Sequence, residues 1–398
     1  MLHHTKLIFF KNKKKYNKLY KYLIIILNSF CIFYSSYYLK NTLDPSYNEI
    51  EQYIKCNLEG NLINSKFRFY KRRNPKISVI ISTFNGEVYL KPAVRSIQNQ
   101  NSLNIEIIIV DDGSMDNTVK VVKELMEEDH RIKLISNLIN RGTLYTKTRG
   151  VLNAKGKYVL TLDQDNLYSV NYSFSILYHE SENNNLDLLG YSTVSTSVEI
   201  KNIKEKHFLN YFETPIITMP NIKRRFIGFI KNEESQTFLF LYFIKLKLFL
   251  EIINQLGEQF LNRNIDAHDD TILMFLLSRK ALRVKYLKAI FYIVLEWPEK
   301  YKEALKFQKN IKKRERERKN CYSYLTFIEI MYLFTENNCD KYIADRFFQL
   351  WFLEKDECKK QKETINYAIK LCNLYLNNQY ISSDTKTKIS IFLNQTKY

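Results

Sequence analysis

Two aspartates one residue apart, Asp163 and Asp165, follow an apolar run from Tyr158 to Leu162. Such a pair suits Mg²⁺ or Mn²⁺, which bind one or two carboxylates and take their other ligands from water and phosphate oxygens. A cation held there would act as a Lewis acid on a departing phosphate group. Acidic surface turns are common, so the position at the end of a buried strand is what favours a metal site.

Short β-rich runs alternate with helical patterns between residues 75 and 195. The β-rich runs are residues 77–82, 105–110, 131–136, 158–162 and, more weakly, 186–194, and the helical patterns are residues 87–98, 117–128 and 143–154. Strands spaced by roughly 25 residues with helices between them predict right-handed βαβ crossovers. We therefore predict an α/β fold with a Rossmann-like, doubly wound and mainly parallel sheet.

Polar residues stand where three of these predicted strands end. They are Thr83 and Asn85, Asp111 and Asp112, and the pair Asp163 and Asp165. Ligands of open α/β sheets bind beyond the carboxyl ends of the strands, so these residues predict a nucleotide site. Neither a G-x-x-x-x-G-K-[ST] loop nor a G-x-G-x-x-G loop is present, so a bound cation would have to neutralise the phosphates.

These motifs, in this order, resemble the nucleotide-sugar half of family 2 glycosyltransferases, which have the GT-A fold. The resemblance is carried by residues 77–90, 96–100, 105–118, 140–142, 148–150, 154–156 and 163–165. It covers residues 75–195 well and residues 235–295 more loosely. Several ordered motifs over this length make a chance match improbable.

The resemblance implies roles for the polar residues that follow the first two strands. Thr83 and Asn85 would line the pocket for the base and ribose of the donor. Asp112 matches the second acid of the family's D-D-x-S motif and would hydrogen-bond the uracil edge or the ribose, while Asp111 would contribute less. The alternative for Asp111 and Asp112 is a capped turn with Gly113.

The resemblance also assigns the groups around the diphosphate. Arg149 is similar to the basic residue that approaches it, and the alternative for Arg149 is a solvated helix face. Asp165, the last acid of the D-x-D motif, would bind the Mn²⁺ or Mg²⁺ ion that bridges the diphosphate. Asp163 would lie beside the ribose or a metal-bound water.

A second acidic pair, Asp269 and Asp270, precedes an apolar helical pattern at residues 272–282 and resembles the family's E-D element. Asp269 replaces the usual Glu, and Asp270 matches the acid that deprotonates the acceptor hydroxyl. A helix N-terminus stabilises a carboxylate, and a base must face the leaving group for in-line displacement. The alternative is an ordinary N-cap. His268 is interpreted as a helix-entry residue rather than a metal ligand.

One departure from the family concerns the acceptor side. Relatives often have a Trp-led segment before this helix, whereas residues 237–245 contain no Trp. The resemblance therefore leaves open which acceptor is used and whether the protein is fully active. Trp297 follows the apolar run 289–295, which is predicted to flank the site as a late strand or helix.

The N-terminal region predicts a membrane anchor. Lysines crowd residues 1–21, residues 22–39 carry no charge and are long enough to span hydrocarbon, and residues 40–74 read as a polar stem. The charge asymmetry predicts a single-pass type II signal anchor with a luminal catalytic domain in the Golgi or ER. The alternative is a buried or interfacial segment.

The other domain predictions follow from composition. Residues 75–298 are predicted to form the GT-A domain, with a nucleotide-sugar half at 75–195 and an acceptor half at 196–298. Residues 299–398 are predicted to be an α-helical appendage with helices at 300–319, 322–334 and 342–376 and a solvated charge run.

The net charge of +19 comes without a recognisable nucleic-acid module, so no nucleic-acid partner is expected. The cysteines lack C-x-x-C spacing, which disfavours a zinc site.

The combined interpretation is an inverting, hexosyltransferase-type glycosyltransferase. It would move a sugar from a nucleoside diphosphate sugar, UDP-linked, to a hydroxyl on a glycan, lipid or protein acceptor. Two rivals remain: a catalytically inactive nucleotide-sugar-binding membrane protein, and a nucleotidyltransferase, which would usually need a triphosphate loop after its first strand.

Overall fold

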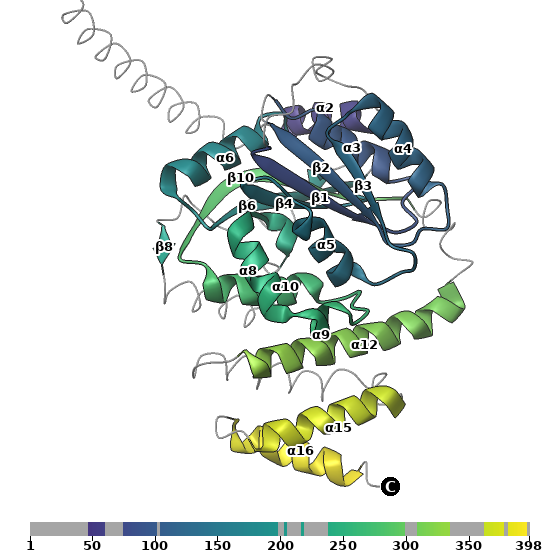
Figure 1. The fold of residues 1–398 in the computed structure, drawn as a ribbon, viewed down its shortest axis with the longest axis vertical. Helices are drawn as coiled ribbons and strands as arrows, with labels where there is room; N and C mark the ends of the chain where they lie inside the picture. Colours follow the sequence, from purple (N-terminus) through teal and green to yellow (C-terminus); the bar gives the residue numbers. More distant parts are fainter. Residues whose placement is uncertain are drawn as a thin grey trace, which may run out of the picture. The chain divides into compact units, whose positions relative to one another are not determined.

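A ten-stranded sheet organises the computed structural model, with the strand order β3-β2-β1-β4-β9-β6-β10-β5. Figure 1 labels β1 to β4, β6 and β10 of this sheet. Strands β7 and β8 join it by pairing with β6 and β10. The residues that the structure describes are 47–59, 75–101, 104–197, 203–204, 216–218, 238–298, 309–334, 362–377 and 381–395.

The first half of the sheet is parallel, as predicted. It consists of β1 (Ile77–Thr83), β2 (Ile105–Asp111), β3 (Ile132–Ser136) and β4 (Tyr158–Asp163). The crossover helices are α3 (Leu90–Gln98), α4 (Thr118–Glu128) and α5 (Thr143–Leu152). β1 and β2 are buried along nearly their whole length, which explains their continuous runs of Ile and Val.

The second half of the sheet is mixed, and here the prediction of a mainly parallel sheet is wrong. β6 (Leu188–Ser197) and β10 (Arg283–Glu296) are parallel, but β9 (Tyr242–Lys245) runs antiparallel between β4 and β6. The short strands β5 (Leu167–Tyr168), β7 (Ile203–Lys204) and β8 (Ile217–Thr218) also pair antiparallel. A β-rich run does not encode its own direction, so this half could not be assigned from sequence.

Helices follow the strands of this half and lead to the second acidic pair. They are α6 (Ser173–Asn184), α8 (Leu246–Leu256), α9 (Glu258–Leu261) and α10 (Asp269–Lys280), with a short 3₁₀ turn at Leu239–Leu241. α10 begins at Asp269, three residues before the apolar helix predicted at residues 272–282, so both acids lie in its first turn.

Strand register brings the predicted polar residues to one edge of the sheet. Thr83 lies opposite Asp111, and Ser82 lies opposite Asp163 on the other side of β1. Asp111 in turn pairs with Ser136 of β3. The carboxyl ends of the four parallel strands are therefore aligned, and the motif residues that follow them start from neighbouring positions.

A helix within the predicted stem, α2 (Tyr47–Leu58), packs against α3. The buried Tyr53 hydroxyl donates to the backbone oxygen of Ser96 at 2.8 Å, and the side-chain amides of Asn99 and Asn57 are 2.8 Å apart. Ile54 is fully buried in an apolar cluster that also contains Trp297. Residues before the predicted domain boundary at 75 therefore pack against the sheet and its helices.

We expect Ile54→Ala to lower the free energy of unfolding by about 2 to 4 kcal/mol, because it removes a fully buried aliphatic group. Urea denaturation of the purified protein measures this change. Gln52→Ala, at an exposed position two residues earlier on the same helix, is the matched control and should change stability by less than about 0.5 kcal/mol. Equal effects of the two substitutions would show that α2 does not pack as described.

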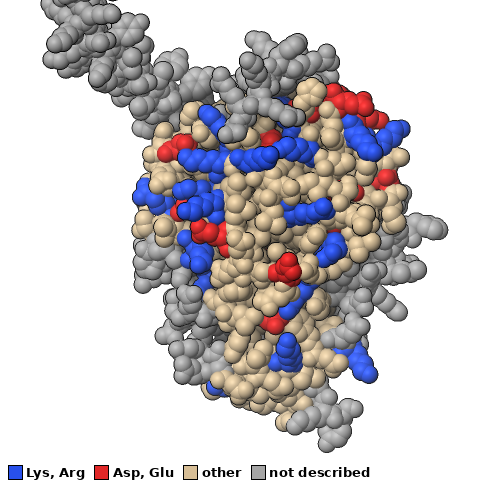
Figure 2. Space-filling model, in the orientation of Figure 1, with Lys and Arg blue, Asp and Glu red and all other residues tan. Residues whose placement is uncertain are grey.

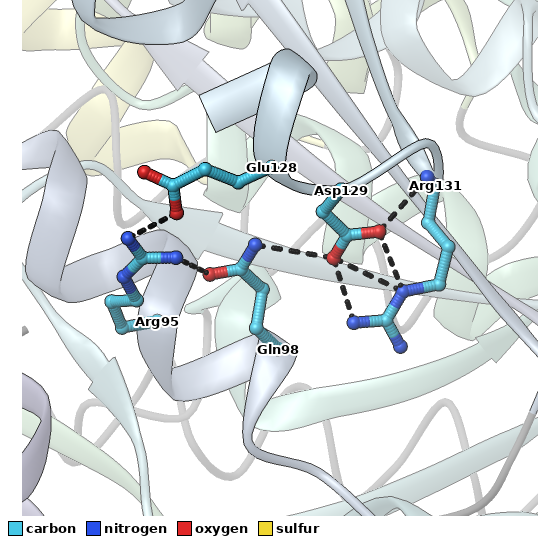
Figure 3. A network of polar contacts seen from close by, with 5 residues as sticks. All are labelled: Arg95, Gln98, Glu128, Asp129 and Arg131. Carbon is cyan, nitrogen blue, oxygen red and sulfur yellow. Dashed lines mark hydrogen bonds and ion pairs between the residues drawn. The ribbon is translucent and has the colours of Figure 1, made fainter. Parts of the chain in front are cut away.

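A polar network joins α3 to the end of α4 (Figure 3). Arg95 is buried and pairs with Glu128, and its second nitrogen donates to Gln98 at 2.6 Å. Gln98 donates to Asp129 at 3.1 Å, and Arg131 forms an ion pair with Asp129 at 2.7 Å. Burial alone would raise the pKa of Asp129, but the bonds from Arg131 outweigh it and lower that pKa. The network fixes the two crossover helices relative to each other.

The C-terminal region is helical over its described part. It contains α12 (Lys309–Leu333), α15 (Lys362–Leu376) and α16 (Ser383–Gln395). α12 is one continuous helix where two segments were predicted. The charge run predicted to be a solvated face lies in its first half, whose side chains are outside the described residues, as is the 342–361 part of the last predicted helix.

The predicted fold class included a transmembrane helix, and this part is corrected. Across the described ranges, no helix is both long enough and apolar enough to cross a bilayer. Residues 22–39, to which the anchor was assigned, lie outside the described residues. The type II orientation and the Golgi or ER location depend on that anchor and stay predictions.

Candidate active site

A buried lysine that the sequence interpretation missed, Lys147, joins the two acidic pairs. Its ammonium nitrogen lies 2.6 Å from Asp270 Oδ1, 2.9 Å from Asp269 Oδ2 and 3.8 Å from Asp163 Oδ1. Burial favours the neutral amine, but the carboxylates outweigh it and raise the pKa of Lys147 well above its usual value. Lys147 is therefore a fixed positive charge on α5 among acids from two other elements, β4 and α10.

Helix α5 carries Lys147 and is held on both sides. Gly150 faces β1 so closely that an added Cβ would come within 2.4 Å of an Ile80 methyl, which lets the helix lie against the sheet. At its N-terminus, the Leu144 amide donates to the Ile265 carbonyl at 3.1 Å. The position of Lys147 is thus set by the parallel sheet and by the segment that leads into α10.

The first turn of α10 holds Asp269 and Asp270. His268 precedes them with φ of 60°, a left-handed conformation that turns the chain into the helix. Burial raises the pKa of Asp270 to about 7; Asp269 and Asp163 add to this, and Lys147 opposes it. Asp270 Oδ1 accepts from Lys147, and Oδ2 has no hydrogen-bond partner within the described part of the chain. This oxygen is the one that can receive a proton near neutral pH.

The other acidic pair lies on the tight loop between β4 and β5. The Asp163 amide donates to the Tyr292 hydroxyl at 3.2 Å, and that hydroxyl lies 3.4 Å from Asp163 Oδ2. Burial raises the pKa of Asp165 to about 6, and the neighbouring Asp163 carboxylate adds to the shift. Two acids that repel each other in this way form a local excess of negative charge.

The last residues of β10 and the residue after it fix the same loop. The Trp297 indole donates to the Asp165 carbonyl at 2.8 Å, and its ring meets Tyr89 edge-on at 4.8 Å. Asn166 accepts from the Leu295 amide at 3.0 Å and donates to the Tyr292 hydroxyl at 3.3 Å. The apolar run before Trp297 is part of the strand β10, whose Leu295 contacts Asn166 beside the acidic pair. That this run flanks an active site stays a prediction. Tyr292 and Asn166 were not predicted as site residues.

Asp111 and Asp112 follow β2 and are both buried. Asp112 accepts from the Asn137 side chain at 2.7 Å and from the amides of Arg141 and Gly142 at 2.8 and 3.0 Å. Asp111 Oδ1 accepts from the Ser114 amide at 3.2 Å. A carboxylate has about four acceptor positions, so Asp112 retains capacity for one further donor. Its predicted contact with the base or ribose stays a prediction.

Thr83 and Asn85 connect the loop after β1 to both neighbouring loops. The Thr83 hydroxyl donates to Gln164 Oε1 at 2.5 Å, which ties this loop to the residue between Asp163 and Asp165. Asn85 has φ of 50°, and its side chain accepts from the Met115 amide at 2.9 Å. The three loops that follow β1, β2 and β4 therefore form one hydrogen-bonded surface.

Arg149 points to a different environment from Lys147. Its guanidinium donates to the Ser136 carbonyl at 2.9 Å and also bonds the Asn137 side chain. Residues two apart on an α-helix do not share a face, so α5 cannot present Lys147 and Arg149 to the same groups. The structure places Lys147 among the carboxylates of the two acidic pairs and Arg149 at the end of β3.

Comparison with known proteins agrees with this arrangement. The family model described as glycosyl transferase family 2 matches residues 78–249. This match covers less than half of the chain and shows that residues 78–249 are similar to family 2 glycosyltransferases. The match includes the loops after β1, β2 and β4 described above.

Curated relatives match this chain over limited stretches. A Campylobacter jejuni GalNAc(5)-diNAcBac-PP-undecaprenol beta-1,3-glucosyltransferase is 45% identical over 92 residues, which are 23% of this chain and 30% of the relative. Bacillus subtilis EpsJ, an uncharacterized glycosyltransferase, is 24% identical over 56% of this chain and 62% of its own length. The chain thus spans only 30% to 36% of several of these relatives.

Solved structures show the same fold over more of the chain. S. aureus TarS 1-349 in complex with UDP-GlcNAc has a TM-score of 0.54 at 16% identity, covering 79% of this chain and 83% of that one. The complex of TarS 1-349 with UDP has a TM-score of 0.52 at 17% identity, covering 75% and 80%. At these identities the likeness establishes the shared fold alone.

The carboxylates of the first acidic pair are the type of ligand that a divalent cation takes. Asp163, Asp269 and Asp270 share a single ammonium group, Lys147, and Asp165 lies two residues from Asp163, so negative charge is in excess. Within the described ranges, no three His, Cys, Asp or Glu side chains are grouped to hold a metal by themselves. A cation at Asp163 and Asp165 would take its remaining ligands from water and phosphate oxygens.

Proposed function

We propose that this chain is a glycosyltransferase that moves a sugar from a nucleoside diphosphate sugar, UDP-linked, to a hydroxyl acceptor. The observation that carries the proposal is the meeting of two acidic pairs across Lys147. One pair, Asp163 and Asp165, ends a parallel strand where nucleotide ligands bind. The other, Asp269 and Asp270, opens α10 and supplies a base.

The donor side is assigned to the loops after β1, β2 and β4. Asp165 and Asp163 would hold Mn²⁺ or Mg²⁺, and such a cation offsets the charge that develops on the departing diphosphate. The uridine assignment is supported by the TarS complexes with UDP and UDP-GlcNAc. Thr83, Asn85 and Asp112 lie on the connected loop surface that would surround the base and ribose.

The acceptor side is assigned to the N-terminus of α10. Asp270 takes the proton from the attacking hydroxyl through Oδ2, while Lys147 holds Oδ1 and fixes the direction of the carboxylate. A pKa raised to about 7 matches this task, since a base works best when its pKa is near the working pH. Displacement by a hydroxyl opposite the leaving group inverts the configuration at the sugar.

Donor hydrolysis with Mn²⁺ tests the proposal, with UDP-GlcNAc and a panel of other UDP-sugars as probes. We expect Asp165→Asn to reduce the Mn²⁺-stimulated rate on the order of 10²-fold, because one of the two candidate ligands is lost. Asp384→Asn, an exposed carboxylate on α16, is the control and should leave the rate unchanged.

Two results would contradict the proposal. A rate that Asp165→Asn leaves unchanged would remove the metal assignment. Tight UDP binding without turnover of any sugar donor in the panel, with or without an added hydroxyl acceptor, would show a nucleotide-sugar-binding protein instead of an enzyme.

A further inference from the structure

The segment that leads into α10, residues 262–268, is held by the C-terminal helices. Arg263 donates to Glu329 of α12 at 2.6 Å and to the Tyr367 hydroxyl of α15 at 2.7 Å. The Tyr367 hydroxyl also bonds Glu329, so the three side chains form a closed triangle. Burial would raise the pKa of Glu329, but the bonds from Tyr367 and Arg263 outweigh it and lower that pKa. Glu329 is therefore a charged, nearly buried anchor for Arg263.

A second contact reaches the residue directly before the acidic pair. The His268 ring lies 5.3 Å from the Tyr324 ring of α12, at an interplanar angle of 62°. Tyr324 is buried, so the surface that His268 meets is fixed. Because His268 has the left-handed conformation that starts α10, this contact acts on the backbone from which Asp269 and Asp270 project.

The same segment also contacts the lysine helix. Asn264 donates to the Asn140 carbonyl at 3.3 Å, and the Ile265 carbonyl accepts from Leu144 in the first turn of α5. Gly142 leaves no room for a side chain here, since an added Cβ would lie 2.7 Å from Ile265 backbone atoms. Residues 262–268 are thus clamped between the helix that carries Lys147 and the C-terminal helices.

Resting on the proposed function, we infer that the C-terminal helices set the position of the catalytic base. Glu329 and Tyr367, acting through Arg263, are positioning residues for Asp270, and Tyr324 acts in the same way through His268. These C-terminal side chains need not contact substrate. Their effect is to fix the start of α10, so that Asp270 Oδ2 faces the acceptor hydroxyl while Lys147 holds Oδ1.

Turnover and UDP affinity should respond differently to Glu329→Gln. We expect kcat to fall about 10-fold to 100-fold, because small misplacements of a reacting group have effects of this size. The Kd for UDP with Mn²⁺ should stay within twofold, since the donor loops belong to other elements. Tyr367→Phe removes one hydroxyl from the triangle and should give a smaller loss of kcat in the same direction.

A double substitution separates positioning from general loss of structure. In an Asp270→Asn background, Glu329→Gln should have no further effect on the residual rate, because it acts through Asp270. Additive losses, or a lowered melting temperature with unchanged kcat at a temperature where the protein is folded, would overturn the inference. Lys388→Gln on α16, whose exposed partner is Asp384, is the control.

Amide hydrogen exchange tests the inference independently of catalysis. Exchange at residues 262–270 should become at least tenfold faster in Glu329→Gln, while exchange in β1 and β2 should not change. Unchanged exchange at residues 262–270 would overturn the inference even if the enzyme is active. Faster exchange in a protein without turnover would show that Glu329 holds residues 262–270 in place. That result would contradict only the proposed function.

Discussion

Asp270→Asn is expected to lower kcat for sugar transfer by about 10² to 10⁴-fold, the usual contribution of a general base. The amide keeps the shape of the side chain and can still accept from Lys147, but it cannot take up the acceptor proton. UDP affinity should be preserved because Asp270 lies on the acceptor side. Initial rates with saturating donor and acceptor, together with calorimetric UDP binding, measure both quantities.

The pH dependence gives this prediction a second readout. The pKa of Asp270 is raised to about 7, so its carboxylate is protonated and inactive at pH 6 and ionised at pH 8. The wild-type rate should therefore rise with pH through about 7 and then level off, and Asp270→Asn should lose this rise. Asp269→Asn is the matched comparison on the same helix turn. A larger loss in Asp269→Asn would assign the base to Asp269.

Lys147→Met is expected to lower the free energy of unfolding by about 3 to 5 kcal/mol, the cost of leaving buried charges without their partner. Methionine keeps most of the length of the side chain, so lost packing contributes little. Activity should fall as well, because Asp163, Asp269 and Asp270 lose the group that joins them. Urea denaturation at pH 8 measures the stability change.

The pH dependence of this variant has a defined sign. Without Lys147 the buried acids gain protons more readily, so the folded state binds more protons than the unfolded state near neutrality. Stability of Lys147→Met should then increase as the pH falls from 8 to 6. Lys388→Met, in a solvent-exposed pair, should differ from wild type by less than about 1 kcal/mol. A variant as stable as wild type would show that the lysine does not balance these acids.

Residue pattern predicted the nucleotide half of the fold closely. The β-branched runs that form β1 and β2 are buried on both faces. Such strands can be predicted from sequence because their hydrophobic residues are nearly continuous. The polar residues at their ends were correctly expected at one edge, because parallel strands align their carboxyl ends. A helix was also predicted at residues 272–282, and α10 covers most of this stretch but begins three residues earlier, at Asp269.

Other features depend on contacts across long stretches of sequence and left no local signal. The nearest carboxylate to the Lys147 ammonium group is that of Asp270, 123 residues later in the chain, and no spacing rule distinguishes Lys147 from Arg149 two residues on. The residues of α2 were assigned to a polar stem. Tyr53 and Asn57 are polar residue types, and only their hydrogen bonds to α3 and the residue after it show that they are buried.

The net charge of the chain also gave no signal for the position of the site. The net charge is +19, yet Figure 2 shows Lys and Arg side chains at several separate places on the face shown, with acidic side chains between them. The total charge says little about where a phosphate binds, because the one lysine that joins the candidate catalytic acids is buried.

The hydrogen bond from Trp297 to the Asp165 carbonyl has a consequence for biosynthesis. The two residues are separated by 132 positions, and Asp270 must also emerge before Lys147 meets its main partner. A ribosome releases the strand ahead of Asp165 long before it releases these later residues. The contact of Trp297 with the Asp165 carbonyl and that of Asp270 with Lys147 can therefore both be in place only after nearly three quarters of the polypeptide has been made.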